Sequence, residues 1–122
     1  MNKWGAVRAR GVPKVVGGMN KTEAAYRDHL ALRERKGEVA WFVFEGVKLR
    51  LADNTFYTPD FSVMLRDGEI EMHEVKGRSG VKYWCEDDAK VKIKVAASIY
   101  PFLFKIVWPK KGSGWDVEDM KC

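Results

Sequence analysis

Residues 55–77, TFYTPDFSVMLRDGEIEMHEVKG, are the stretch that decides the fold. Two runs rich in β-branched, aromatic and apolar residues flank Arg66-Asp67-Gly68, and such runs around a turn predict a β-hairpin. We therefore expect one strand at 55–65 and a second, antiparallel to it, at 70–76. Pro59 interrupts the first strand directly before an acid, and proline removes a donor from the hydrogen-bond ladder.

The segments before this hairpin predict a helix and one more strand. Asn20 is a good N-cap, and Glu23, three positions later, completes a capping box, so a helix is expected from Asn20 to Gly37. Residues 39–51 are aromatic and β-branched, which is strand composition, and Gly46 marks a bulge or bend. Together with the hairpin, this strand predicts a three-stranded antiparallel meander.

The segments after the hairpin predict a second helix and a last strand. Residues 91–95 alternate as a strand would, but Asp87-Asp88 favour a helix N-terminus and an apolar helical stripe follows. We predict the helix, ending before Pro101, then a buried strand at 102–108 and a polar tail. A strand that returns after a helical crossover lies parallel to its neighbour. The predicted fold is α/β, a mixed sheet built as helix, three-stranded meander, helix and strand.

Composition bounds the class of protein. With 122 residues, 46% of them hydrophobic, the chain is long enough for one packed core. No apolar run approaches the roughly 20 residues of a membrane span, and no secretory signal opens the chain. Cys85 and Cys122 are not spaced for a structural zinc site. We expect a cytoplasmic protein with free thiols and no membrane partner.

The net charge of +5 is concentrated at the start of the chain. Residues 1–19 are rich in glycine and contain no acid. Their basic side chains are Lys3, Arg8, Arg10 and Lys14. We predict a basic arm at 1–19 and a folded domain at 20–122. The charge of the arm favours a polyanionic partner such as DNA, although a solvated basic tail explains it equally well.

The chemistry is carried by an acid in one strand and by an acid and a lysine at the end of the next. Strand periodicity puts Glu74 and Lys76 on one face, and the hairpin makes Asp60 their neighbour. Two carboxylates that hold a divalent cation, with a lysine to stabilise developing negative charge, suit phosphodiester hydrolysis. Alone, Pro-Asp is common in turns and Glu-x-Lys is common on solvated strands. Their order at adjacent strand ends favours catalysis.

Pro59-Asp60 followed by Glu74-Val75-Lys76 resembles the signature of the PD-(D/E)xK nuclease superfamily. The resemblance covers most of the chain, since the restriction-endonuclease-like core of that superfamily is also a helix, three antiparallel strands, a helix and a further strand. It implies that Asp60 and Glu74 bind Mg²⁺ or Mn²⁺ and that Lys76 assists the attacking water. It also implies that Glu23 adds an acid from the first helix, where the alternative is a capping role alone.

A finer resemblance is to small phage-encoded proteins of this superfamily, some of them Holliday-junction resolvases. The segments that carry it are Asn20-Lys21-Thr22-Glu23, Thr58-Pro59-Asp60-Phe61, Glu74-Val75-Lys76-Gly77 and Asp88-Ala89-Lys90-Val91-Lys92. It implies a Mg²⁺-dependent endonuclease that acts on branched DNA as a homodimer, in the cytoplasm of a bacterial host. A nickase, a replication or packaging accessory nuclease, and a non-catalytic nucleic-acid-binding module on the same fold stay open.

The remaining polar and aromatic side chains have simpler interpretations. Arg78, Lys90 and Lys92 are candidates for contacts to DNA phosphates, although a loop arginine and a solvated helix face explain them equally well. His73 alternates away from Glu74, which favours a core or hydrogen-bonded histidine over a catalytic base. The aromatic residues expected in the core rather than in base-stacking platforms are Trp41, Phe42, Phe44, Phe102 and Phe104.

Overall fold

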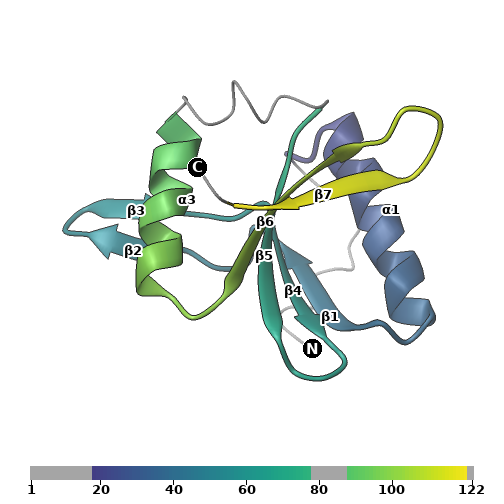
Figure 1. Cartoon of the computed structure of the whole chain (residues 1–122), viewed down its shortest axis with the longest axis horizontal. Helices are drawn as coiled ribbons and strands as arrows, with labels where there is room; N and C mark the ends of the chain where they lie inside the picture. Colours follow the sequence, from purple (N-terminus) through teal and green to yellow (C-terminus); the bar gives the residue numbers. More distant parts are fainter. Residues whose placement is uncertain (1–17, 78–87, 121–122) are drawn as a thin grey trace.

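Two helices and seven strands make up the part of the chain that the computed structural model describes, residues 18–77 and 88–120. They are α1 (Lys21–Arg35), β1 (Val39–Phe44), β2 (Leu49–Ala52), β3 (Thr55–Tyr57), β4 (Phe61–Leu65), β5 (Ile70–Val75), α3 (Asp88–Ile99), β6 (Leu103–Pro109) and β7 (Trp115–Asp119). Five strands form a mixed sheet in the order β1-β4-β5-β6-β7, and β2 and β3 form a separate two-stranded sheet (Figure 1). The predicted α/β class with a mixed sheet is confirmed. Within the described ranges, no helix is both long and apolar enough to cross a membrane.

Helix α1 begins and ends where the sequence predicts. Asn20 Oδ1 accepts a hydrogen bond from Glu23 N at 2.8 Å, and Glu23 Oε1 accepts one from Asn20 N at 2.9 Å, which completes the capping box. At the other end, Gly37 has a left-handed backbone with φ 85°, a conformation that stops a helix. Tyr26 and Leu30 are the buried residues of α1 and face the sheet.

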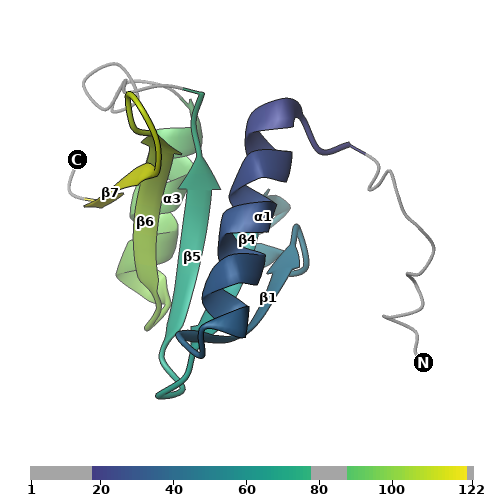
Figure 2. The same ribbon diagram turned by 90° about the vertical axis from the view of Figure 1, so that its right-hand side faces the viewer.

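The five-stranded sheet separates two hydrophobic cores. Figure 2 shows α1 and α3 on opposite faces of the sheet. The core on the α1 side contains Tyr26, Leu30, Val39, Phe61, Val63, Val75 and Val107. The core on the α3 side contains Leu49, Tyr57, Met72, Ile93, Ala96, Phe104 and Ile106. Alternate residues of β5 and β6 therefore enter different cores, as the two-residue period of a strand requires.

The single strand predicted at 39–51 is wrong, because this segment contributes to two sheets. β1 ends at Phe44, and Glu45 then adopts a left-handed backbone with φ 48° that turns the chain away. Gly46 lies against the side chain of Val43, where a Cβ atom would come within 2.4 Å of Val43 Cγ1. The bend expected at Gly46 is thus confirmed, but it ends the strand.

The strand predicted at 55–65 is likewise divided, into β3 and β4, and Pro59 lies in the gap. β3 pairs with β2 rather than with the main sheet, and this hairpin lies beside α3 (Figure 1). In the main sheet β4 pairs antiparallel with both β1 and β5. The predicted antiparallel trio therefore exists as β1-β4-β5, with the β2–β3 hairpin inserted between its first two members.

The second half of the fold confirms a helix and a parallel strand and adds one strand that was missed. α3 is helical, and β6 lies parallel to β5, as predicted. The polar tail expected after residue 109 is wrong, because β7 pairs antiparallel with β6. Trp115 of β7 packs edge-on against Tyr26, with ring centroids 4.8 Å apart. A charged strand at a sheet edge lacks the apolar alternation that identifies buried strands.

Most of the aromatic residues expected in the core are there. Phe104 is buried, and Phe42, Phe44 and Phe102 pack against the two cores. Trp41 is the exception, because its side of β1 faces solvent and 44% of the residue is exposed.

The close approach of Gly46 to Val43 gives a prediction about stability. Replacing Gly46 by alanine is expected to destabilise the fold by roughly 1–3 kcal/mol, because the new methyl group would overlap a β-branched side chain with little rotamer freedom. Urea unfolding followed by circular dichroism measures the change. Gly77→Ala is the control, since a Cβ atom there meets nothing within 4 Å. Equal stability of the two variants would show that the turn after β1 adapts without strain.

Candidate active site

Asp60 and Glu74 lie side by side at the junction of β4 and β5. The register pairs Phe61 with His73, so the residues one step further along, Asp60 and Glu74, stand opposite each other. Asp60 Oδ2 accepts a hydrogen bond from Val75 N at 2.8 Å, which fixes its carboxylate against β5. Both acids are only partly exposed. The sequence-predicted convergence of these two acids is therefore present in the structure.

The two carboxyl groups are held in surroundings that oppose their ionisation. The pKa of Glu74 is raised to about 7, first by burial and then by the negative charge of Asp60. Burial also raises the pKa of Asp60 to about 6, against the hydrogen bond from Val75 N, which lowers it. Ionising both acids brings two negative charges together. A cation placed between the two carboxylates stabilises the ionised pair, because it offsets their repulsion.

Lys76 is the positive group of the site. It follows β5 directly, and its backbone N donates to Val107 O at 2.8 Å, which anchors the end of the strand. Its charge lowers the pKa of both Asp60 and Glu74, so the ammonium lies within electrostatic reach of both. The structure thus brings the predicted acid–acid–lysine set together.

Glu23 is close to this set but is held by its own helix. Its negative charge raises the pKa of Asp60 and of Glu74, which places it near both acids. Its Oε1 accepts the capping hydrogen bond from Asn20 N. Among the residues that the structure describes, no group of three or more acidic, histidine or cysteine side chains is arranged to hold a metal ion. Glu23 therefore caps α1 in this conformation, and the site contains two converging acids.

Two carboxylates are a suitable donor set for one class of metal. Mg²⁺ takes oxygen ligands and is usually bound through one or two protein carboxylates, while waters and substrate phosphates complete its shell. Structural zinc sites need four ligands from the protein, and calcium sites take six to eight oxygens. Asp60 and Glu74 could therefore hold Mg²⁺, or Mn²⁺ with similar ligand preferences.

Tyr57 and Glu45 belong to the site but have no assigned role in the sequence-based prediction. Tyr57 Oη donates a hydrogen bond of 2.5 Å to Glu74 Oε1, and burial keeps the pKa of this phenol above its usual value. Glu45 N donates to Asp60 O at 2.8 Å, and the charge of Glu45 raises the pKa of Asp60. Tyr57 stands three residues before Asp60, but its role depends on how the β2–β3 hairpin packs.

The hydrogen bond from Tyr57 gives a prediction about metal binding. Tyr57→Phe is expected to weaken Mn²⁺ binding roughly tenfold, because the phenol both orients Glu74 and lowers its pKa. Titration of Mn²⁺ by electron paramagnetic resonance measures the affinity without any turnover. Tyr100→Phe is the matched control, since that hydroxyl donates to Arg50 O at 2.7 Å and not to a carboxylate. Equal Mn²⁺ affinity in the two variants would show that the Tyr57 hydroxyl makes no contribution to metal binding.

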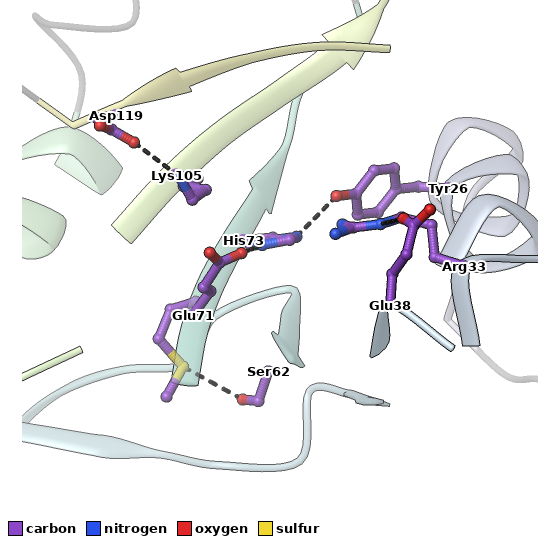
Figure 3. Close-up of polar contacts among 9 residues, drawn as sticks. Tyr26, Arg33, Glu38, Ser62, Glu71, His73, Lys105 and Asp119 are labelled. Atoms are coloured by element: carbon purple, nitrogen blue, oxygen red, sulfur yellow. Dashed lines mark hydrogen bonds and ion pairs between the residues drawn. The ribbon is translucent and has the colours of Figure 1, made fainter. Parts of the chain in front are cut away.

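His73 lies on the other face of β5 and takes no part in the acid pair. Figure 3 shows it between Tyr26 of α1 and Glu71. Tyr26 Oη lies 2.7 Å from Nδ1 of His73, and Nε2 lies 2.9 Å from Glu71 Oε1. Burial lowers the pKa of His73, so the neutral ring accepts from the phenol and donates to Glu71. The expectation of a buried, hydrogen-bonded histidine is confirmed, and this network ties α1 to the sheet.

The basic residues predicted to contact DNA fall in two groups. Lys3, Arg8, Arg10, Lys14 and Arg78 lie outside the described residues. Lys90 and Lys92 are on α3, which packs against β2, β3 and β6, and Lys92 is exposed. Lys90 and Lys92 therefore lie on the side of the sheet to which Glu74 also points, since Glu74 stands two residues after Met72 of the α3-side core and shares its face of β5.

Comparison with known proteins adds no identification. No family model, no curated protein and no solved structure matches this chain.

Proposed function

We propose that this chain is a metal-dependent DNA endonuclease of the PD-(D/E)xK type, with a restriction-endonuclease-like core. The observation that carries the proposal is the convergence of Asp60 and Glu74 across β4 and β5, with Lys76 at the end of β5. A surface ion pair would leave these acids with lowered pKa values, as is the case for Glu38 beside Arg33. Raised pKa values at two adjacent acids favour a functional site.

Each side chain has a definite task in this proposal. Asp60 and Glu74 would hold Mg²⁺ or Mn²⁺, which when bound neutralises phosphate oxygens and lowers the pKa of a water molecule. Lys76 stabilises the negative charge that develops on the phosphoryl group. The Tyr57 hydroxyl and Val75 N orient the two carboxylates. Glu23 would join the acids only by releasing its capping hydrogen bond to Asn20.

The finer proposal concerns the substrate and the assembly. We propose branched DNA as the preferred substrate, as in the Holliday-junction resolvases that the sequence resembles, in the cytoplasm of a bacterial host. Symmetric cutting of two strands requires two active sites related by a two-fold axis, and hence a homodimer. The basic side chains of residues 1–19, with Arg78, Lys90 and Lys92, would contact phosphates without reading the sequence.

The alternative is a nucleic-acid-binding module that performs no chemistry. The observation in its favour is that Glu23 caps α1 and that the described residues hold no cluster of three metal-binding side chains. In that case the acid pair would be a remnant on a binding surface.

Incubation with supercoiled plasmid and with a synthetic four-way junction tests the proposal. Cutting in Mg²⁺ or Mn²⁺ but not in EDTA supports the nuclease, and paired symmetric nicks in the junction select the resolvase. Single nicks in the plasmid with no preference for the junction would select a nickase or an accessory nuclease. Tight DNA binding without any cutting, in either metal, would make the non-catalytic module the better description.

A further inference from the structure

The β2–β3 hairpin has two faces of different character. Its inner face packs into the α3-side core through Leu49 and Tyr57, which are both buried. Its outer face presents Arg50 directly opposite Phe56, and Lys48 Nζ lies 4.7 Å from the centre of the Phe56 ring. All three of these side chains belong to exposed residues. The Lys48 ammonium thus lies over a face of a partly exposed aromatic ring, and Arg50 stands opposite that residue on the neighbouring strand.

The Phe56 ring is only partly covered, and one group that covers it is a cation. Phe56 is 36% exposed, although transfer of a phenylalanine side chain out of water is favourable. Arg50 has Asp53 at 3.9 Å, but both side chains are largely exposed, and such a pair contributes little. An aromatic face offers a stacking surface to any nucleobase, and flanking lysine and arginine side chains neutralise the phosphates on either side of that base.

The backbone beneath this face is fixed. Tyr100 Oη at the end of α3 donates a hydrogen bond of 2.7 Å to Arg50 O. Leu49 pairs with Tyr57 on the buried side, and Arg50 with Phe56 on the exposed side. A rigid platform loses less conformational entropy on binding than a mobile loop would lose.

The platform is also close to the candidate active site. Phe56 precedes Asp60 by four residues, so a fully extended chain could separate their Cα atoms by at most about 14 Å. Tyr57, the next residue after Phe56, donates its hydroxyl hydrogen to Glu74. Phe56 and Tyr57 point to opposite faces of the hairpin, so a strand with a base on Phe56 would reach the two acids by passing around the hairpin over a path of a few nucleotides.

We infer that the outer face of the β2–β3 hairpin is a binding site for an unpaired DNA nucleotide. The base stacks on Phe56 in place of the Lys48 ammonium, which now lies over the ring, and Lys48 and Arg50 contact the adjoining phosphates. In a continuous duplex the bases are stacked on one another and offer no free face, so this site favours single-stranded, frayed or branched DNA. The inference rests on the proposed nuclease function for its choice of DNA as ligand, but it makes a claim about binding that is independent of cleavage.

The test measures binding in EDTA, where no metal-dependent cutting occurs. Fluorescence anisotropy gives the affinity for a labelled single-stranded oligonucleotide and for the matching blunt duplex. Phe56→Ala is expected to weaken single-strand binding about tenfold and duplex binding by less than about threefold. Trp41→Ala is the matched control, since Trp41 is also an exposed aromatic residue, but on β1. Phe56→Trp keeps the stacking surface and is expected to retain the affinity.

The two cations are tested in the same assay. The double variant Lys48→Gln/Arg50→Gln is expected to weaken single-strand binding and to reduce its dependence on salt, relative to Lys36→Gln/Arg66→Gln at exposed positions elsewhere. Equal losses for Phe56→Ala and Trp41→Ala, or equal losses on single strand and duplex, would overturn the inference. If the protein cuts DNA but Phe56→Ala leaves single-strand binding unchanged, the nucleotide-binding site is refuted and the nuclease proposal stands. If the protein binds single strands selectively but cuts no DNA, only the nuclease proposal is refuted.

Discussion

Replacing Glu74 by glutamine is expected to abolish metal-dependent DNA cleavage and, in the same protein, to raise its stability without metal. The amide keeps the shape of the side chain and can still accept the hydrogen bond from Tyr57, but it carries no charge to hold a cation. We expect cleavage to fall by roughly 100- to 1,000-fold or more, the range found when a charge-stabilising group is removed from an active site.

The gain in stability follows from the raised pKa of Glu74. An acid whose pKa is higher in the folded than in the unfolded protein is easier to ionise after unfolding, so stability falls as pH rises from the unfolded towards the folded pKa. For Glu74 this window runs from 4.5 to about 7. Above it the ionised group destabilises the fold by on the order of 3 kcal/mol, and Mg²⁺ that binds the ionised pair restores stability.

Thermal unfolding in EDTA and in Mg²⁺, at pH 5 and pH 8, separates these effects. At pH 8 in EDTA, Glu74→Gln is expected to melt several degrees above the natural protein, and the difference should shrink at pH 5. Mg²⁺ should stabilise the natural protein and leave the variant unchanged. Glu69→Gln, at an exposed turn position, is the control. A lower melting temperature for Glu74→Gln under all four conditions would mean that Glu74 is a structural hydrogen-bonding group and no metal ligand.

Lys76→Met is expected to lower cleavage by roughly 100- to 1,000-fold at saturating metal while DNA binding changes little. The lysine charge acts on both carboxyl groups, whose pKa values it lowers, and in the proposed reaction it also acts on the phosphoryl oxygens. Its loss therefore reduces both the ionised fraction of the acid pair and the stabilisation of the transition state.

Two comparisons isolate the second of these effects. Cleavage is measured at pH 7 and pH 9 with saturating Mn²⁺. At pH 9 the acids are ionised even without the lysine, so a rate that stays low there reports the loss of transition-state stabilisation. Lys36→Met removes a lysine charge from an exposed position at the end of α1 and should leave cleavage unchanged. Cleavage by Lys76→Met within about threefold of the natural rate would exclude a catalytic role for this lysine.

The parts of the fold that follow local rules could be predicted from the sequence. The capping box of Asn20 and Glu23 marks the start of α1, and the turn before Gly68 closes the β4–β5 hairpin. The division of strands at Glu45 and Pro59 could not be predicted in full, because the sequence does not show that the segment between them pairs with itself. β7 could not be predicted, because among the described strands it is an edge strand paired only with β6 and its acidic side chains interrupt the apolar–polar alternation by which strands are identified.

The candidate site could likewise be predicted only in part from the sequence. The antiparallel register that follows from the hairpin turn is sufficient to bring Asp60 and Glu74 together. The contribution of Tyr57 depends on the packing of the β2–β3 hairpin beside α3, which is a contact between segments distant in the sequence. Glu45 reaches Asp60 through the pairing of β1 with β4, for which no turn signal exists in the sequence.

The acidic character of β7 has a consequence for how copies of this protein meet. β7 is the last strand of the sheet, and one of its edges is open among the described residues. Asp116, Glu118 and Asp119 lie along it, around the exposed Val117. A second copy that added its own β7 in antiparallel fashion would bring carboxylates face to face, which is unfavourable. The open edge therefore resists strand-by-strand aggregation, and the homodimer that we propose is expected to form through a different surface.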